Sequence, residues 1–242
     1  MKKIMKEWTV DSIWGKIAMV SWGNPTKPPI LLVHGYMDSA ATFILLVNQL
    51  PDSYYYVGFD MPGHGKSDPF PNGPLISQLH IVETVRLVVD HMKWNQFVYL
   101  SHSMGFIIGA FYNHLFPGKI TKMVHVDPVV PTTMYYYVHN KPSLWFSYSY
   151  DSYYSSYERW NAGSSKKMTL DEAVNVLVMN RSISEEQAET VISRSLIPVG
   201  EGKYKFSWDS KMKKILSVPI SEETFFHRHN TACASNAHIT GY

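Results

Sequence analysis

The chain has 242 residues, of which 45% are hydrophobic and 17% are charged, a composition that suits one globular domain with a substantial core. Its formal net charge of +2 is too small to indicate binding to nucleic acid or to an acidic membrane surface. The single cysteine, Cys233, excludes an internal disulfide, and no stretch approaches the roughly 18 apolar residues that span a bilayer. No apolar run of signal-peptide length follows the basic start. We therefore expect a chain without a transmembrane segment, in the cytoplasm or another reducing intracellular compartment.

The first elements are a hairpin and a buried strand. Residues 8–22 alternate loosely and predict a hairpin with Gly15 at its turn. The proline-bounded run "PPILLVHGY" is typical of a buried parallel strand, and Asp38 or Ser39 is the expected cap of a helix over 40–50. A strand over 54–60, a turn over 61–68 and a helix over 77–93 are expected next. A strand over 97–100, a helix over 104–116 and a strand over 122–127 follow. Strands that alternate with helices predict a parallel sheet covered on both faces.

The alternation stops beyond residue 130. "TLDEAVNVLVMN" and "SEEQAETVISRSL" each begin with a capping-box pattern and predict two helices, and "YKFSW" suggests a short strand. No later segment has the pattern of a buried parallel strand. We therefore divide the chain into a core over 1–130, a mostly helical lid over 131–215 and an irregular tail over 216–242, and expect the sheet to lack its last strands.

The stretch "LSHSMGFIIGAF" places Ser103 between a predicted strand and a predicted helix. A tight turn at this point lifts a serine hydroxyl clear of the sheet, where a base can reach it. Small residues are needed two positions before and after the serine, and here they are Ser101 and Gly105. Ser103 is therefore the candidate nucleophile, and the alternative is a simple helix cap.

An acyl-transfer site also needs donors for the oxyanion that forms during the reaction. The backbone amide of Met104, directly after the serine, is one candidate. The second is the amide of Tyr36 in "HGYMDSAATF", where Gly35 permits the bend. We expect His34 to hold this loop by hydrogen bonds rather than to act as a base.

In this order, "LLVHGYMDSAATF", "GFDMPGHGKSD" and "LSHSMG" resemble the α/β-hydrolase superfamily, and in particular the serine hydrolase-like proteins. The resemblance is strong over about residues 8–130 and weak to about 215. It implies an α/β-hydrolase fold, an esterase-type activity and a triad in the chain order serine, acid, histidine. It implies no cofactor and no metal.

The acid and the histidine are harder to assign. Asp127 follows the strand after the one that leads to Ser103, which is a position some relatives use for the acid, and the alternative is a turn-former before the lid. Asp60 is expected to hold loops together. His102 is adjacent to Ser103 and should point away from it, and His64 resembles a turn residue without a role in the triad. The remaining histidines are His227, His229 and His238, in a tail with no predicted strand before them.

Compared with a full hydrolase of this kind, about 70–100 residues are expected to be missing at the carboxyl end. We therefore expect a serine hydrolase that acts on a small apolar ester and is impaired because no catalytic histidine is evident. The alternative is a non-catalytic, truncated hydrolase that binds a ligand or a protein. The aromatic residues of the lid either line an apolar pocket or pack the lid onto the core; they are Tyr135, Tyr136, Tyr137, Trp145, Phe146 and Trp160.

Overall fold

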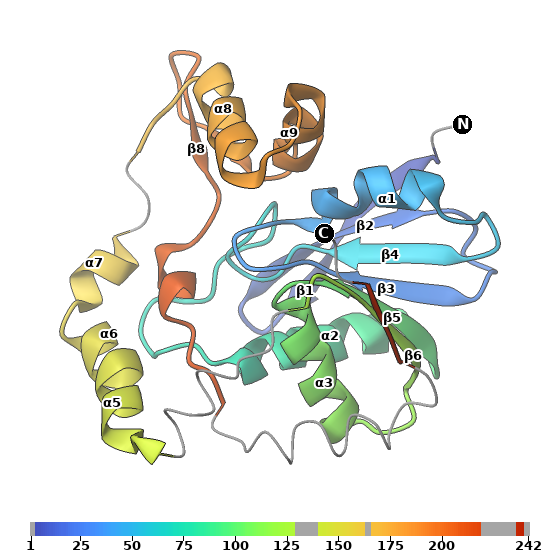
Figure 1. The fold of residues 1–242 in the computed structure, drawn as a ribbon, viewed down its shortest axis with the longest axis horizontal. Helices are drawn as coiled ribbons and strands as arrows, with labels where there is room; N and C mark the ends of the chain where they lie inside the picture. Colours follow the sequence, from blue (N-terminus) through green and yellow to red (C-terminus); the bar gives the residue numbers. More distant parts are fainter. Residues whose placement is uncertain (1–2, 129–139, 163–165, 219–235, 240–242) are drawn as a thin grey trace.

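The computed structural model describes residues 3–128, 140–162, 166–218 and 236–239 (Figure 1). A seven-stranded sheet of the order β1-β2-β4-β3-β5-β6-β9 forms its centre. The strands are β1 (Met5–Ser12), β2 (Gly15–Trp22), β3 (Pro29–Val33), β4 (Tyr55–Phe59), β5 (Phe97–His102), β6 (Ile120–Val126) and β9 (Asn236–Ile239). The pairs from β4 to β9 are parallel, and β1 and β2 form the predicted antiparallel hairpin.

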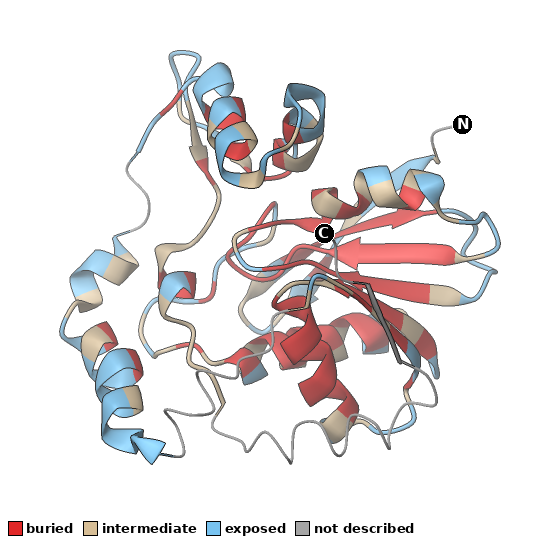
Figure 2. Cartoon of the chain, viewed as in Figure 1, coloured by how far each residue is buried: buried red, intermediate tan, exposed pale blue. Residues whose placement is uncertain are grey.

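Helices cover both faces of the sheet, as the alternation of strands and helices predicted. They are η1 (Ala40–Phe43, a 3₁₀ helix), α1 (Ile44–Gln49), α2 (Gln78–His91) and α3 (Gly105–Leu115). Along β3, Leu31 and Val33 belong to the apolar core that contains residues of α2 and α3. Ile30 and Leu32 point to the other face and pack with η1 and α1. Figure 2 shows the resulting buried layer of strands between the helices.

The predicted lid is mostly helical where the structure describes it. Its elements are α5 (Pro142–Phe146), the π-helix η2 (Ser147–Asp151), α6 (Ser152–Tyr154), α7 (Tyr157–Asn161), α8 (Leu170–Arg181), α9 (Glu185–Ile192), β7 (Leu196–Pro198), β8 (Tyr204–Phe206) and the 3₁₀ helix η3 (Ser210–Lys214). Both predicted capping boxes are present, at Thr169 for α8 and at Ser184 for α9. These two helices bury an apolar cluster together with Phe206 of β8.

The end of the chain corrects one expectation. We expected no sheet strand in the tail over 216–242, but β9 pairs in parallel with β6, with Ala237 opposite Val124 and Ile239 opposite Val126. The sheet therefore has one strand more than its sequence pattern indicated. Among the described helices, none is long and apolar enough to cross a membrane.

Candidate active site

Ser103 lies at the turn between β5 and α3, as the sequence predicted. Its φ of 52° is in the left-handed region, which is costly for a residue with a Cβ atom. The turn is held on both sides, because Ser103 N–H donates to the carbonyl of Val126 at 3.1 Å and Ser103 C=O accepts from Phe106 N–H at 3.0 Å. The side chain is half-buried. This geometry is that of a nucleophile elbow.

Two glycines allow the chain to pass closely around this serine. A Cβ atom at Gly105 would lie 2.5 Å from the Val33 carbonyl oxygen and 3.1 Å from that of His34. A Cβ atom at Gly35 would lie 2.9 Å from the Cβ of Ser103. The loop after β3 is therefore in direct contact with the elbow.

Two backbone amides at this contact have no recorded acceptor among the described residues. In the described part of the chain, neither Tyr36 N–H nor Met104 N–H donates a recorded hydrogen bond to another residue. These are the two groups that the sequence analysis named as oxyanion donors. Unused N–H groups beside an elbow serine are suited to hold a developing negative charge.

His34 and His64 hold the surrounding loops. The ring of His34 bonds to the Gly35 carbonyl through Nδ1 (2.7 Å) and accepts from Met61 N–H through Nε2 (2.9 Å). His64 Nε2 accepts from Met37 N–H at 3.2 Å. Burial lowers the pKa of both rings, and that of His64 falls to about 3. Both rings are therefore neutral and are occupied by the backbone.

Asp60 also ties separate segments together. Its carboxylate accepts N–H groups from Ala40 and Lys66, each at 2.8 Å. Arg194, which follows α9 in the lid, forms a buried ion pair with the same carboxylate at 2.9 Å. Asp60 therefore connects η1, the turn after β4 and the lid.

The acid candidate lies beside the elbow. Asp127 directly follows Val126, whose carbonyl accepts the Ser103 amide, so both residues are at the carboxyl edge of neighbouring strands. Asp127 is exposed, has a φ of 47°, and forms no recorded ion pair or hydrogen bond within the described residues. Its position is compatible with either of the two roles considered for it.

No base for the serine is visible in the part of the chain that the structure describes, because no histidine nitrogen there is hydrogen-bonded to Ser103 Oγ. Nδ1 of His102 lies 3.8 Å from Asp38 Oδ2, in the loop after β3. His227 and His229 lie outside the described residues. The backbone of His238 is in β9, opposite His125 of β6.

Sequence reasoning missed two contacts beneath and above the elbow. Beneath it, the buried Ser101 Oγ lies 2.7 Å from Nδ1 of His125, so the serine that replaces a small glycine has a partner of its own. Above it, Arg181 at the end of α8 bonds to the buried carboxylate of Asp38 at 3.2 Å and to the Met37 carbonyl at 3.4 Å. The lid is thus attached to the loop that carries Tyr36.

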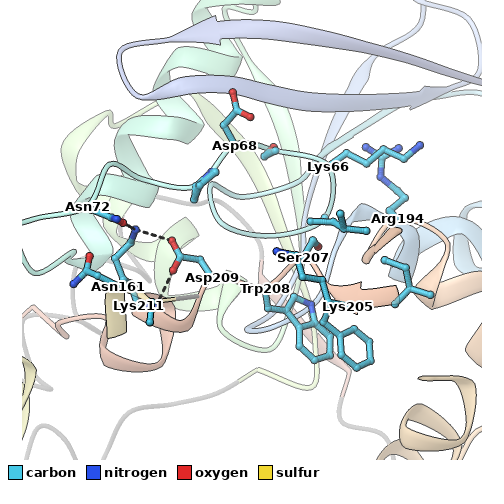
Figure 3. A pocket seen from close by; sticks show the side chains of 17 residues that line it. Lys66, Asp68, Asn72, Asn161, Arg194, Lys205, Ser207, Trp208, Asp209 and Lys211 are labelled. Atoms are coloured by element: carbon cyan, nitrogen blue, oxygen red, sulfur yellow. Dashed lines mark hydrogen bonds and ion pairs between the residues drawn. The ribbon is translucent and has the colours of Figure 1, made fainter. Parts of the chain in front are cut away.

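Cavities border the lid. Figure 3 shows one of about 460 Å³ with mixed polar and apolar walls, where Lys211 Nζ bonds to Asn72 Oδ1 at 2.6 Å and pairs with Asp209 at 3.1 Å. Ser103 does not line this cavity. A second cavity of about 310 Å³ is bordered by Met37 of the Tyr36 loop and has apolar walls that include Met168, Val176, Phe206 and Trp208.

The fold and the elbow define a class of protein that the comparisons confirm. The sequence profile of the α/β hydrolase fold matches residues 28–170, so the chain belongs to the α/β-hydrolase fold family. Two solved structures show the same fold. One is a hypothetical protein from Pseudomonas aeruginosa PAO1, with a TM-score of 0.81 and 21% identity over 97% of this chain and 81% of that one. The other is a thioesterase domain from the curacin biosynthetic pathway, with a TM-score of 0.75 and 19% identity over 97% and 82% of the two chains.

Within this family the curated relatives include serine hydrolase-like proteins, as the motifs indicated. The human serine hydrolase-like protein is 39% identical over 115 residues, which are 47% of this chain and 56% of the human protein. The protein of the same name from Danio rerio is 27% identical over 230 residues, which are 92% of this chain and 68% of the fish protein. The chain matches only 56% of the human relative, so any activity of the whole relative is only a proposal for this chain.

Proposed function

We propose that this chain is a serine hydrolase that acts on carboxylic esters, with Ser103 as its nucleophile. Ser103 Oγ attacks the ester carbonyl and gives its proton to a histidine, while the amides of Tyr36 and Met104 hold the oxyanion. The protonated histidine then donates the proton to the departing alkoxide, and water releases the acyl group in a second round. Asp127 orients the histidine.

The observation that carries this proposal is the arrangement around the elbow. Ser103 has a left-handed backbone, the Gly35 loop touches its Cβ position, and two amide donors at this contact have no recorded partner. A simple helix cap does not require the close approach of a second loop. The combination favours a nucleophile over a cap.

The third member of the proposed triad is the histidine that acts as the base. The tail contains His227, His229 and His238, and β9 brings part of this tail to β6, whose end carries Asp127. Asp127 and β9 therefore lie on the same strand pair, next to the strand that leads to Ser103. We propose that one of the three tail histidines takes the proton.

The substrate class follows from the second cavity. Ser103 does not line this cavity, but Met37, the neighbour of Tyr36, does. Its walls combine the apolar side chains named above with Lys166, Asp209, Ser210 and Lys213. An apolar acyl group of about 310 Å³ or less would suit this space. Of the lid aromatics named above, Tyr135, Tyr136 and Tyr137 lie outside the described residues. The intracellular, reducing location stays a prediction from the single cysteine.

The test is covalent labelling with a fluorophosphonate, which reacts with activated serines. We expect labelling of the chain, its loss in Ser103→Ala, and no change in Ser143→Ala, because Ser143 is exposed on α5. Alanine variants of His227, His229 and His238 follow, and we expect one of them to lose labelling by two or more powers of ten, roughly. Equal labelling of the chain and Ser103→Ala would exclude Ser103 as the nucleophile.

The alternative function is a non-catalytic module that binds a ligand or a protein. It is favoured by the lack of a histidine bonded to Ser103 within the described residues. Absence of labelling in a chain that folds cooperatively would support this alternative. Labelling that depends on a tail histidine would exclude it.

A further inference from the structure

The first helical arm of the lid, residues 142–154, presents aromatic rings to solvent. Phe146, Tyr150 and Tyr154, which we call the aromatic ladder, recur every fourth residue and are 50%, 45% and 42% exposed. The rings of Phe146 and Tyr150 are stacked, with centroids 4.7 Å apart, and that of Tyr154 is tilted against Tyr150 at 4.8 Å. Tyr148, between them in the chain, is 68% exposed.

The orientation of the arm is fixed by its other side. Tyr153 is buried, and its hydroxyl donates to the Gly73 carbonyl at 3.0 Å. Ser149 is buried as well, and the Tyr154 hydroxyl accepts from Leu75 N–H at 3.3 Å. Figure 2 shows α5 at the side of the molecule, largely exposed. Phe146 and Tyr150 therefore face outward, and Tyr154 is partly exposed beside them while its hydroxyl anchors the arm.

Such a concentration of exposed apolar surface has no counterpart elsewhere in the described residues. Of the 15 large hydrophobic side chains that are exposed there, five lie between Leu144 and Tyr154. Single exposed hydrophobic residues are ordinary, whereas a contiguous patch usually marks a contact surface.

Basic side chains lie on the arm and on the elements that follow it or contact it. Lys214 of η3 lies over the Tyr148 ring at 4.6 Å, and Arg159 lies over the Trp160 ring at 5.0 Å. Lys141 and Lys213 are exposed at the start of the arm and on η3. The exposed carboxylates on the arm and α7 are Asp151 and Glu158, so these four cations outnumber them.

We propose that the arm docks on a phospholipid surface that contains anionic lipids. Tyrosine and phenylalanine rings are favourable at the level of lipid headgroups, where one end of the ring is apolar and the other is wet. Lysine and arginine side chains beside such rings are attracted to anionic headgroups. Both features are present here on one anchored helical arm.

The arm belongs to the same lid as α8, and Arg181 at the end of α8 bonds to the Met37 carbonyl in the loop that carries Tyr36, at 3.4 Å. If the proposed function holds, on which this step rests, the ester would be a lipid taken from the surface on which the arm sits.

The test is sedimentation of the purified chain with phosphatidylcholine vesicles, with and without phosphatidylserine. We expect the chain to sediment with the anionic vesicles and to be released by high salt. The variant Phe146→Ser, Tyr150→Ser, Tyr154→Ser should lose this binding by about tenfold or more. The matched control is Leu170→Ser, Met179→Ser, which removes two exposed apolar side chains from α8 and should bind like the original chain.

A second variant keeps the proposal testable if the triple change unfolds the arm, as circular dichroism would reveal. Lys141→Glu, Lys213→Glu leaves the ladder intact and should weaken binding to the anionic vesicles only. Failure of the original chain to bind vesicles would overturn the proposal, as would equal losses in the ladder and control variants. A dimer in size-exclusion chromatography that the ladder variant abolishes would assign the surface to a second copy instead.

These experiments distinguish a failure of the docking proposal from a failure of the proposed hydrolase activity. Ser103→Ala should bind vesicles as well as the original chain does, because the serine is not part of the ladder. Vesicle binding without fluorophosphonate labelling would support the docking surface and contradict the proposed hydrolase activity.

Discussion

Among single residues, Gly105 is a position where backbone atoms leave no room for a side chain. It lies where α3 begins and where the carbonyls of Val33 and His34 approach from the end of β3. These carbonyls belong to backbone that cannot rotate away as a side chain could. The position of the Ser103 turn therefore depends on residue 105 being a glycine, which has no Cβ atom.

We expect Gly105→Ala to destabilise the fold by about 1–3 kcal/mol, because the new methyl group must push α3 away from β3. The same displacement should slow fluorophosphonate labelling of Ser103. Urea unfolding and the labelling rate measure the two effects, and Ser143→Ala is the control. An unchanged unfolding midpoint together with an unchanged labelling rate would mean that the turn tolerates the methyl group.

The buried ring of His64 makes stability depend on pH. Its pKa falls from 6.5 to about 3 on folding because burial disfavours the charged ring, with a smaller contribution from His34. Between these two values the unfolded chain binds a proton that the folded chain does not. The contribution is therefore fully present above about pH 6.5 and is lost, at about 1.4 kcal/mol per pH unit, as the pH falls towards 3.

We expect His64→Gln to lose part of this acid sensitivity, since glutamine keeps an acceptor for Met37 N–H but does not titrate. Between about pH 7.5 and pH 5, the fall in unfolding free energy should be smaller by about 2 kcal/mol than in the original chain. Urea unfolding at both pH values measures it. His91→Gln, on the exposed end of α2, is the control, and an equal fall in His64→Gln and the original chain would contradict the assignment.

At the scale of elements, the end of α8 controls the loop that carries Tyr36. Arg181 neutralises the buried carboxylate of Asp38 and also bonds to the Met37 carbonyl. The Tyr36 loop thus contacts the elbow through Gly35 and the lid through Asp38 and Met37. A movement of α8 would change the position of the Tyr36 amide.

We expect Arg181→Gln to destabilise the fold by about 1–2 kcal/mol, a value kept small because the arginine is partly exposed. Hydrogen exchange of residues 36–41 should accelerate, and labelling of Ser103 should slow. Arg159→Gln is the matched control, because Arg159 stacks on Trp160 and has no carboxylate partner in the described residues. If exchange in this loop rose equally in both variants, the link through Asp38 would be wrong.

At the scale of the molecule, β9 covers the edge of β6. An uncovered parallel edge presents free N–H and C=O groups to other chains. We expect a chain that ends at Ser235 to unfold at a lower temperature and to form larger species in size-exclusion chromatography. A chain that ends at Ile239 is the control, since it loses only the three residues beyond β9, and identical behaviour of the two would show that β9 adds nothing.

The parts of this fold that could be predicted from sequence are those with local causes. Ser103 lies between an apolar strand and an apolar helix, and the capping boxes at Thr169 and Ser184 are each complete within four residues. The contact of Arg181 with Asp38 joins residues 143 apart, and neither has a local pattern that indicates the other. β9 has only four residues, and it is a strand because β6 is there to pair with.

The ion pair of Arg194 with Asp60 has a consequence for synthesis on the ribosome. Asp60 leaves the ribosome 134 residues before its cation, a delay of about 7–27 s at typical elongation rates. Until then its carboxylate has the Ala40 and Lys66 amides within reach but no arginine, so burying it would be costly. We therefore expect the carboxyl end of β4, where Asp60 lies, to stay hydrated while the first half of the chain emerges and to become buried only when Arg194 arrives.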